Sequence, residues 1–600
     1  MRELSVKICL LFYLFFLFFQ IHPSLVNPDG IGYYAYVRSL FLDGDLDFFN
    51  EFEALGIIPP FIYQTPTGLV GNQYPIGSAV LWVPFFLLGH LYTLLSPYFY
   101  PLPLRPDGYS VFYLTFIALG TSFYGALGLF LVYEVGRQLF PPKTVALTIV
   151  LIVFGTPFFY YLFIQPTLAH MNSFFTLSLF FYVWFFTRNR RTLEQWALLG
   201  LLAGLMGLVR TQNLLFILLP FLEQMRERKG GGMGERENGR VKKRRGSPIP
   251  SLLTFLGALL FAFIPQMLAW KALHGALIFP IQGLLNLNFK DGHLLELLFS
   301  PFHGLFFWSP LLLLTLPGLY VLTRKDLLLG VGLSTFLLLQ ILLNSWALYW
   351  WGGYSFGSRF FVDYTFLFIL ALAGFIHWLS AIGGRGWKAK TRKQKPVPAP
   401  VGGLEGKEQK VGGRDTLQRP SPASFFLPMT YGVLGGLGLW NFLLFLQSTL
   451  HRLDLNQYIS VQDLGRGQLW ALKHLLPATL QILLLPKLPG KVLWYLTPAF
   501  LFTALVFIAG CRGARRYASA GRAKITGRPA ADNERRVPLV GVLLGGYLAG
   551  FTLWLFLAYA HTGPLSHRTE VSRTVEDFKT FLHTQAKTVY EDYLKKWNEN

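Results

Sequence analysis

Runs of roughly 20 apolar residues recur along almost the whole of this 600-residue chain. A helix of about 20 residues is long enough to cross the hydrocarbon core of a bilayer. The composition agrees, because 53% of the residues are hydrophobic and only 14% are charged, whereas soluble domains carry about 25% charged residues. The sequence therefore predicts an all-α polytopic membrane protein.

Half of the positive charge is confined to three loops. Residues 223–248 hold nine Lys and Arg, residues 381–423 hold ten and residues 512–537 hold eight, out of 53 in the chain. Loops rich in Lys and Arg stay on the cytoplasmic side of a membrane, and their composition is typical of disordered linkers. The net charge of +22 therefore reflects membrane topology, and we expect no nucleic-acid partner.

We expect about 13 transmembrane helices. The candidate spans are residues 4–26, 109–135, 143–163, 168–187, 194–208, 210–224, 250–270, 304–323, 327–346, 359–380, 424–447, 491–511 and 538–560. With the N-terminus in the cytoplasm, this order places all three basic loops inside. It places the acidic first loop, residues 27–108, and the C-terminus outside. No small-residue cleavage site follows the first span, so we interpret it as an uncleaved helix.

One apolar segment, residues 74–96, does not fit this count. A full span here would move every basic loop to the outside, so we expect an interfacial or re-entrant hairpin within the first outer loop. Its prolines, Pro75 and Pro84, and its aromatic residues favour an interfacial position. At the other end of the chain, apolar residues in 561–600 recur at steps of three, four and seven, which predicts an amphipathic helical tail.

The first outer loop carries an unusual concentration of acid. Six of the 31 Asp and Glu residues lie within 25 positions, namely Asp29, Asp43, Asp45, Asp47, Glu51 and Glu53. Asp29 follows the first span closely, so it lies near the bilayer face, and aromatic residues that suit a sugar ring follow it. A solvated loop acid that merely ends the helix is the alternative. The Asp-x-Asp-x-Asp run over residues 43–47 is compatible with a divalent cation held by oxygen ligands.

Two further polar residues interrupt apolar segments. Arg210 divides the apolar run 194–224 into two short helices, and an ionisable residue inside a membrane protein usually faces a cavity or a partner. An interhelical ion pair is the alternative interpretation. His170 begins the span 168–187, where a capping or interfacial histidine fits as well as a catalytic one.

The segment 344–359 combines aromatic residues with three glycines, at positions 352, 353 and 357. An aromatic belt at the membrane interface explains the aromatic residues but not the glycines, which permit tight backbone turns. Arg359 ends the segment and suits a phosphate, because its guanidinium presents a planar fork to anionic oxygens. Asp363, one helical turn later, is its competing partner.

In this order along the chain, the features resemble the membrane-embedded glycosyltransferases of the C superfamily. Protein O-mannosyltransferases and bacterial lipid A aminoarabinose transferases belong to that group, and the pattern is similar to that of bacterial family 39 members. The resemblance covers about residues 1–380. It rests on Asp29, Asn72-Gln73-Tyr74-Pro75, Gly136-Arg137-Gln138-Leu139-Phe140, Arg210 and the stretch from Trp351 to Arg359.

The resemblance implies a domain organisation. Residues 1–380 would form a glycosyltransferase-C-like core, with its active site in the extracytoplasmic loops, and residues 381–423 a basic cytoplasmic linker. Additional transmembrane helices would occupy residues 424–560, and residues 561–600 would form an extracytoplasmic tail. The expected location is the plasma (inner) membrane.

The resemblance also implies an activity. Such an enzyme transfers a hexosyl or pentosyl group from a polyprenyl phosphate to an extracytoplasmic lipid, glycan or protein, with inversion. It implies Asp29 as the base, with His170 as a second catalytic candidate, and it requires no cofactor. Candidate donor-phosphate ligands are Arg210, Arg359 and Lys290. Candidate substrate-binding residues are Tyr33, Tyr34, Tyr74, Trp351 and Tyr354, and candidate metal ligands are Asp43, Asp45 and Asp47.

The chain departs from the family pattern at two places. Many relatives have two adjacent acids where this chain has Asp29-Gly30, and many have a second acid where this chain has His170. One of the three later aspartates would then replace that second acid. The rival interpretation is a transporter or flippase of lipid-linked sugars, but the sequence shows neither the internal repeats nor the midplane ionisable residues typical of transporters.

Overall fold

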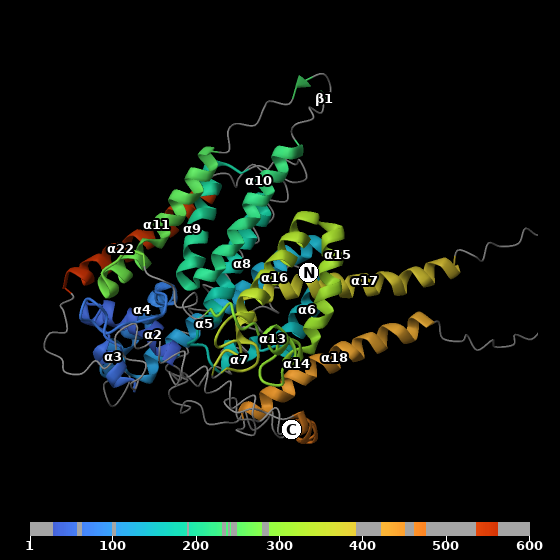
Figure 1. Ribbon diagram of the computed structural model, residues 1–600, viewed down its shortest axis with the longest axis horizontal. Helices are drawn as coiled ribbons and strands as arrows, with labels where there is room; N and C mark the ends of the chain where they lie inside the picture. The colour runs from blue at the N-terminus through green and yellow to red at the C-terminus, as the bar shows by residue number, and fades with distance from the viewer. Residues whose placement is uncertain are drawn as a thin grey trace, which may run out of the picture.

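The computed structural model describes residues 28–56, 63–98, 104–188, 191–230, 236–237, 240–241, 249–278, 287–353, 355–391, 422–449, 461–475 and 536–561. Throughout these ranges the chain is mainly helical (Figure 1), which confirms the all-α prediction. Within the described ranges, five helices are long and apolar enough to cross a membrane, namely Gly77–Tyr98, Val111–Leu139, Ile249–His274, Leu327–Ser345 and Arg359–Ile382. The protein is therefore a multi-pass membrane protein by the length and composition of its helices. The predicted count of about 13 spans is not confirmed.

The chain begins with α2 (Pro28–Arg38), the π-helical turn η1 (Ser39–Asp43), α3 (Phe49–Ala54), α4 (Gly77–Leu95), η2 (Ser96–Tyr98), α5 (Val111–Leu139), α6 (Pro142–Gly155), α7 (Phe158–Phe163) and α8 (His170–Thr187). It continues with α9 (Leu193–Val209), η3 (Thr211–Ile217), α10 (Leu218–Gly230), β1 (Arg236–Glu237), β2 (Arg240–Val241), α11 (Ile249–His274), α13 (Leu294–Phe299), α14 (Leu305–Trp308), η4 (Pro310–Leu314), α15 (Thr315–Lys325) and α16 (Leu327–Ser345). The last described elements are η5 (Arg359–Tyr364), α17 (Thr365–Thr391), α18 (Pro422–Thr449), α19 (Val461–Lys473) and α22 (Arg536–His561).

The two short strands lie within the basic loop 223–248. They pair antiparallel, with Arg236 opposite Val241 and Glu237 opposite Arg240. Several predicted segments lie wholly or mostly outside the described residues: the spans 4–26 and 491–511, the linker 381–423 beyond Thr391, and the helical tail 561–600 beyond its first residue.

The prediction of a re-entrant hairpin at residues 74–96 is wrong, and an interfacial position for this segment stays a prediction. Residues Gly77–Leu95 form one continuous helix, α4, which retains Pro84 in its interior. A proline removes one backbone hydrogen bond, but helices in membrane proteins tolerate this when neighbouring groups compensate. Packing outweighs the proline here, because Trp82 and Phe86 on either side of it are fully buried.

Arg210 divides its apolar run as predicted. Helix α9 ends at Val209, Arg210 adopts an extended backbone with φ −151° and ψ 118°, and the 3₁₀ helix η3 follows. Two other predicted spans are also interrupted, each at a proline. The span 143–163 breaks at Thr156-Pro157 between α6 and α7, and the span 304–323 breaks at Ser309-Pro310 between α14 and η4.

Small residues allow the helices to approach closely. Side by side in Figure 1, α9 and α11 pack along a face where Gly200 and Gly204 lie against the α11 backbone. An added Cβ at Gly204 would lie 2.5 Å from the Cβ of Ala262. This small-xxx-small spacing is typical of helix contacts in membranes, where close packing replaces the hydrophobic effect as the driving force.

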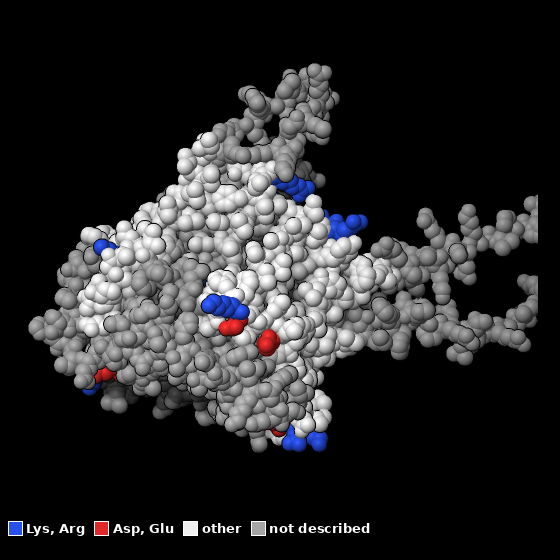
Figure 2. All heavy atoms as spheres, in the orientation of Figure 1, with Lys and Arg blue, Asp and Glu red and all other residues white. Residues whose placement is uncertain are grey.

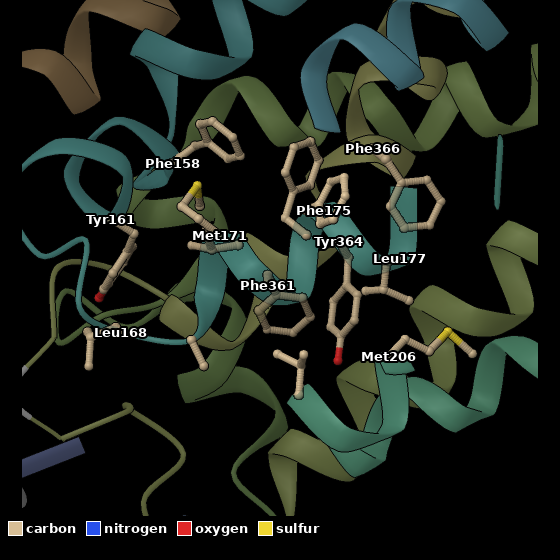
Figure 3. Close-up of a cluster of buried hydrophobic side chains, with 14 of the residues drawn as sticks. Phe158, Tyr161, Leu168, Met171, Phe175, Leu177, Met206, Phe361, Tyr364 and Phe366 are labelled. Atoms are coloured by element: carbon tan, nitrogen blue, oxygen red, sulfur yellow. The ribbon is translucent and has the colours of Figure 1, made fainter. Parts of the chain in front are cut away.

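An aromatic and aliphatic core surrounds the start of α8 (Figure 3). Phe158 and Tyr161 reach it from α7, Met171 and Phe175 from α8, and Phe361 from η5. On the face shown in Figure 2, the Lys, Arg, Asp and Glu residues that are described are few and scattered over an uncharged surface. Charged side chains buried inside such a molecule therefore require specific partners.

Candidate active site

Asp29 lies in the first turn of α2, where a helix presents its unpaired backbone N–H groups and the positive end of its dipole. A carboxylate is favoured at this position. The Asp29 side chain is 21% exposed, whereas all residues from Gly30 to Arg38 are buried. The Asp29 carboxylate at the start of α2 is thus partly accessible to solvent or a ligand, whereas the rest of the helix from Gly30 on is buried.

Tyr74 contacts Asp29 from the segment that precedes α4. Its hydroxyl donates a hydrogen bond to Oδ1 of Asp29 at 2.9 Å. Asn72 fixes this segment, because its side-chain amide donates to the Gly32 carbonyl at 2.8 Å and its Oδ1 accepts from the Tyr74 N–H at 3.1 Å. Burial and the neighbouring Asp29 charge raise the pKa of Tyr74 well above its ordinary value, so the hydroxyl remains a donor.

Arg359 reaches Asp29 from the far side of the sequence. Its Nη1 lies 3.1 Å from Oδ2 of Asp29, across a separation of 330 residues. The glycines before it have positive φ angles, 85° at Gly352, 65° at Gly353 and 61° at Gly357, as the predicted tight turns require. At Gly352 an added Cβ would lie 3.0 Å from Cγ of Arg359, so the turn packs directly on the arginine.

Asp363 is not the partner of Arg359, contrary to the prediction. Its Oδ1 instead accepts a hydrogen bond from Nδ1 of His170 at 2.7 Å, and its Oδ2 lies 3.3 Å from Nε of Arg210. Nη2 of Arg210 in turn lies 3.5 Å from Nε2 of His170. Residues one helical turn apart can pair, but η5 presents Arg359 and Asp363 to different neighbours.

Tyr33 joins the two groups into one site. Burial raises the pKa of its hydroxyl to about 12, the charges of Arg210 and Arg359 oppose that rise, and those of Asp29 and Asp363 add to it. Arg359 and Asp363 also share the short helix η5, so the Asp29–Arg359 and Arg210–Asp363 pairs are neighbours. The Tyr33 ring also lies 5.1 Å from the Tyr74 ring, which places two aromatic rings beside Asp29.

Several buried polar atoms of the site lack a hydrogen-bond partner among the residues that the structure describes. They are Nε of Arg210, Nε of Arg359 and Oδ2 of Asp363. Nε of Arg210 and Oδ2 of Asp363 face each other at 3.3 Å as an ion pair without an aligned hydrogen bond, whereas Nε of Arg359 has no such partner among the described residues. An unpaired buried donor is costly. Such a donor suits an anionic ligand.

The remaining predicted residues lie at different distances from this cluster. Tyr34 is fully buried and its hydroxyl donates to the Gly108 carbonyl. Trp351 is buried beside the glycine turn, where its carbonyl contacts Nδ1 of His303 at 2.8 Å. Lys290 is exposed in the loop next to the bridge between Leu287 and Ala347. Tyr354 lies outside the described residues, and the substrate-binding role of each of these residues stays a prediction.

The three later aspartates take part in local contacts. Asp43 pairs with Arg38 at 2.5 Å, Asp45 accepts from the Ser39 hydroxyl at 2.8 Å, and Asp47 accepts from the Phe49 N–H at 3.2 Å. Within the described ranges, no group of three or more His, Cys, Asp and Glu side chains is placed to hold a metal ion. The metal-site prediction therefore finds no support in this part of the chain.

The association of Asp363 with His170 and Arg210 was not predicted from the sequence. Gln212 was also not predicted as a site residue; its amide donates to the Tyr364 hydroxyl at 2.8 Å. Gln212 had a weak signal, because it is a polar residue directly after Arg210 in an apolar run. No sequence signal pairs His170 with Asp363, which are 193 residues apart.

The combination of multiple membrane-spanning helices with a cluster of one open carboxylate and two arginines fits a membrane glycosyltransferase of the C superfamily. Residues 112–223 match the family model described as Dolichyl-phosphate-mannose-protein mannosyltransferase. This confirms the resemblance within α5 to α10, the region that contributes His170 and Arg210.

Other comparisons add little. No curated protein matches the chain. A solved structure, "Crystal Structure of ArnT from Cupriavidus metallidurans in the apo state", is similar over 80% of this chain and 77% of that chain, with 12% sequence identity and a TM-score of 0.38. A likeness of that degree carries no argument about the site.

Proposed function

We propose that this protein transfers a hexosyl or pentosyl group from a polyprenyl-phosphate donor to an extracytoplasmic lipid, glycan or protein, with inversion at the anomeric carbon. The observation that carries the proposal is that the short helix η5 brings Arg359, paired with Asp29, next to Asp363, paired with Arg210. The family match over residues 112–223 supports it.

In this mechanism the acceptor hydroxyl attacks the anomeric carbon while the bond from that carbon to the phosphate oxygen breaks. Asp29 takes the hydroxyl proton, and the polyprenyl phosphate leaves with the bonding electron pair. A carboxylate offers about four acceptor positions, so the bonds from Tyr74 and Arg359 still permit one from an acceptor hydroxyl. The leaving group is already anionic, so it needs cations more than a general acid.

The arginines supply those cations. Nε of Arg359 has no hydrogen-bond partner among the described residues, and Arg210 keeps Nη1 beyond its contacts with Asp363 and His170. A guanidinium binds phosphate oxygens through charge-assisted hydrogen bonds. Because Arg359 also contacts Asp29, a phosphate that draws Arg359 away would leave Asp29 better able to accept a proton. The half-buried Tyr74 ring lies beside the carboxylate and can contact the sugar, with the buried Tyr33 ring packed against it. The proposed chemistry requires no cofactor from the protein.

The same proposal orients the chain in a plasma (inner) membrane, with α4 lying along the interface although it is long enough to cross. The N-terminus and the three basic loops lie in the cytoplasm, and the first outer loop and the C-terminus lie outside. A topology reporter fused after residue 400 should then be cytoplasmic and one fused after residue 565 extracytoplasmic. The reverse result at either position would contradict this orientation.

The decisive experiment uses the purified full-length protein in lipid vesicles, supplied with polyprenyl-phosphate hexoses or pentoses that carry an isotopic label. The acceptor class for this assay is first identified by mass spectrometry of cell-surface glycans and lipids from cells with and without the gene. That acceptor is then added to the vesicles. We expect label to enter the acceptor and free polyprenyl phosphate to accumulate in equal amount. Movement of the labelled lipid across the bilayer without a new glycosidic bond would establish the rival function, a flippase.

Replacing Gly32 by Ala should weaken this activity by displacing Tyr74. An added Cβ would lie 2.0 Å from Cδ2 of the Tyr74 ring, so the ring must move and its hydrogen bond to Asp29 is lost. A net loss of about 1.4 kcal/mol for one such bond corresponds to a roughly tenfold fall in kcat. Gly257→Ala is the matched control, because nothing lies within 4 Å of its added Cβ. Equal activity of the two variants would show that Tyr74 does not assist Asp29.

A further inference from the structure

Two buried residues lie behind Arg210. The side chains of Asp363 and His170 are 0% exposed, whereas the Arg210 side chain is 15% exposed. Neither buried side chain has a surface from which to contact a substrate. Both contact Arg210, which is also the group of the three whose charge acts most strongly on Tyr33.

The hydrogen bonds assign a tautomer to His170. Its Nδ1 lies 2.7 Å from Oδ1 of Asp363, an acceptor, so Nδ1 carries the proton. Nε2 is then the unprotonated nitrogen, and it faces the donor Nη2 of Arg210 at 3.5 Å. A neutral imidazole thus links a carboxylate to a guanidinium, and both of its nitrogens are engaged.

Neighbouring elements hold this assembly from several sides. The Tyr161 ring lies 4.6 Å from the His170 ring, and the Tyr161 hydroxyl accepts from the Phe356 N–H at 2.9 Å. On the other side, Asn213 donates to the Ser173 hydroxyl at 2.9 Å, which ties η3 to α8. Asp363 lies in the same short helix as Arg359, so η5 connects both arginines of the site.

We propose that Asp363 and His170 are positioning residues that hold the Arg210 guanidinium in one orientation toward the donor phosphate. This inference rests on the proposed function and assigns roles within the same site. It replaces the expectation of a catalytic His170, because the imidazole contacts Arg210 and Asp363 and is closed to solvent. Asp363 and His170 contact Nε and Nη2 of Arg210, so Nη1 of the partly exposed guanidinium remains for a second anion.

Asp363→Asn tests the orientation without removing the contact to His170, because an amide oxygen can still accept from Nδ1. The variant removes the counter-charge of Arg210, so its affinity for the anionic donor should be equal or higher. Its kcat should nevertheless fall by about 30-fold, since a misaligned donor stabilises the departing phosphate poorly. The expected result for the folded fraction is therefore a lower kcat with a donor KM that is unchanged or lower. If Asp363 served only stability, the kcat of the folded fraction would equal that of the wild type.

A double-mutant cycle with Arg210→Gln separates the two roles. If Asp363 acts through Arg210, the double variant should match Arg210→Gln alone to within about threefold in kcat, because the orienting group then has nothing to orient. Losses in kcat that multiply would overturn the proposal. His170→Gln, which retains a donor and an acceptor, should resemble Asp363→Asn, and an unchanged kcat in both variants would also overturn it.

Two controls complete the experiment. All variants are first compared by size-exclusion profile and unfolding temperature. The three residues would be assigned to stability alone if none of three variants folds: Asp363→Asn, His170→Gln and the double variant, in which both charges of the pair are removed. Affinity for polyprenyl phosphate without sugar is measured in parallel. If the wild-type protein transfers no sugar, the proposed function fails by itself. The inference then stands if Arg210→Gln weakens lipid-phosphate binding about tenfold and Asp363→Asn does not, and it falls if Arg210→Gln binds as wild type.

Discussion

Asp29→Asn should reduce sugar transfer by about 10²- to 10⁴-fold, the usual contribution of a general base, while the protein still folds and inserts. An amide has nearly the shape of a carboxylate, and its oxygen can still accept the hydrogen bond from Tyr74. It cannot accept a proton from the acceptor hydroxyl. The expected loss therefore lies in kcat, measured as product formed in vesicles at saturating donor.

The matched control for this variant is Asp107→Asn. Asp107 belongs to the same first loop, and its Oδ1 accepts from the Tyr109 N–H at 2.9 Å, a contact that an amide oxygen can retain. Asp107→Asn should keep transfer within about twofold of wild type, because this half-buried residue lies outside the site and an amide retains its backbone contact. Full activity in Asp29→Asn would remove Asp29 from the mechanism, and equal losses in both variants would show a general effect on the loop.

Much of the helical architecture could be predicted from the apolar runs. The expected spans 109–135 and 327–346 correspond to α5 (Val111–Leu139) and α16 (Leu327–Ser345). Length and hydropathy determine such elements locally. The breaks at Pro157 and Pro310, and the continuity of α4 through Pro84, depend instead on packing. Proline is compatible with either outcome when neighbouring groups compensate for the lost hydrogen bond.

The candidate site shows the same division between local and tertiary information. Arg210 was identified because an ionisable residue in an apolar run is costly and needs a partner. Asp29 was identified from the concentration of acids after the first span, and Arg359 from the glycine- and aromatic-rich segment that it ends. Their pairing was not predictable, since Asp29 and Arg359 are 330 residues apart. The nearest sequence partner, Asp363, was therefore assigned to the wrong arginine.

The tyrosines after Asp29 illustrate a geometric limit. Successive residues of a helix point about 100° apart, so Tyr33 and Tyr34 of α2 cannot both face the same site. In the structure Tyr33 lies against Tyr74 beside Asp29, whereas Tyr34 reaches Gly108. The sequence pattern marked both residues because both are aromatic, and only the orientation of α2 separates them.

Arg359→Ala should weaken donor binding more than it weakens folding. A hydrogen bond to a charged group contributes about 1.5–3 kcal/mol, so the donor KM and the Kd for polyprenyl phosphate should rise by roughly 10- to 150-fold. The side chain is 16% exposed, so its removal opens some space and also takes the cationic partner from Asp29. The unfolding temperature of the variant therefore has to be measured beside its binding. The measurement is lipid-phosphate binding by the purified variant, together with transfer kinetics at varied donor concentration.

Arg359→Lys distinguishes charge from shape in the same position. A lysine ammonium retains the charge but lacks the planar fork of a guanidinium, so it should restore binding only in part. Arg466→Ala is the matched control, because Arg466 is 78% exposed on α19 and pairs with Asp463 at 3.7 Å. If Arg359→Ala binds polyprenyl phosphate as tightly as this control, the phosphate must be held by other groups, and Arg359 would serve only to orient Asp29.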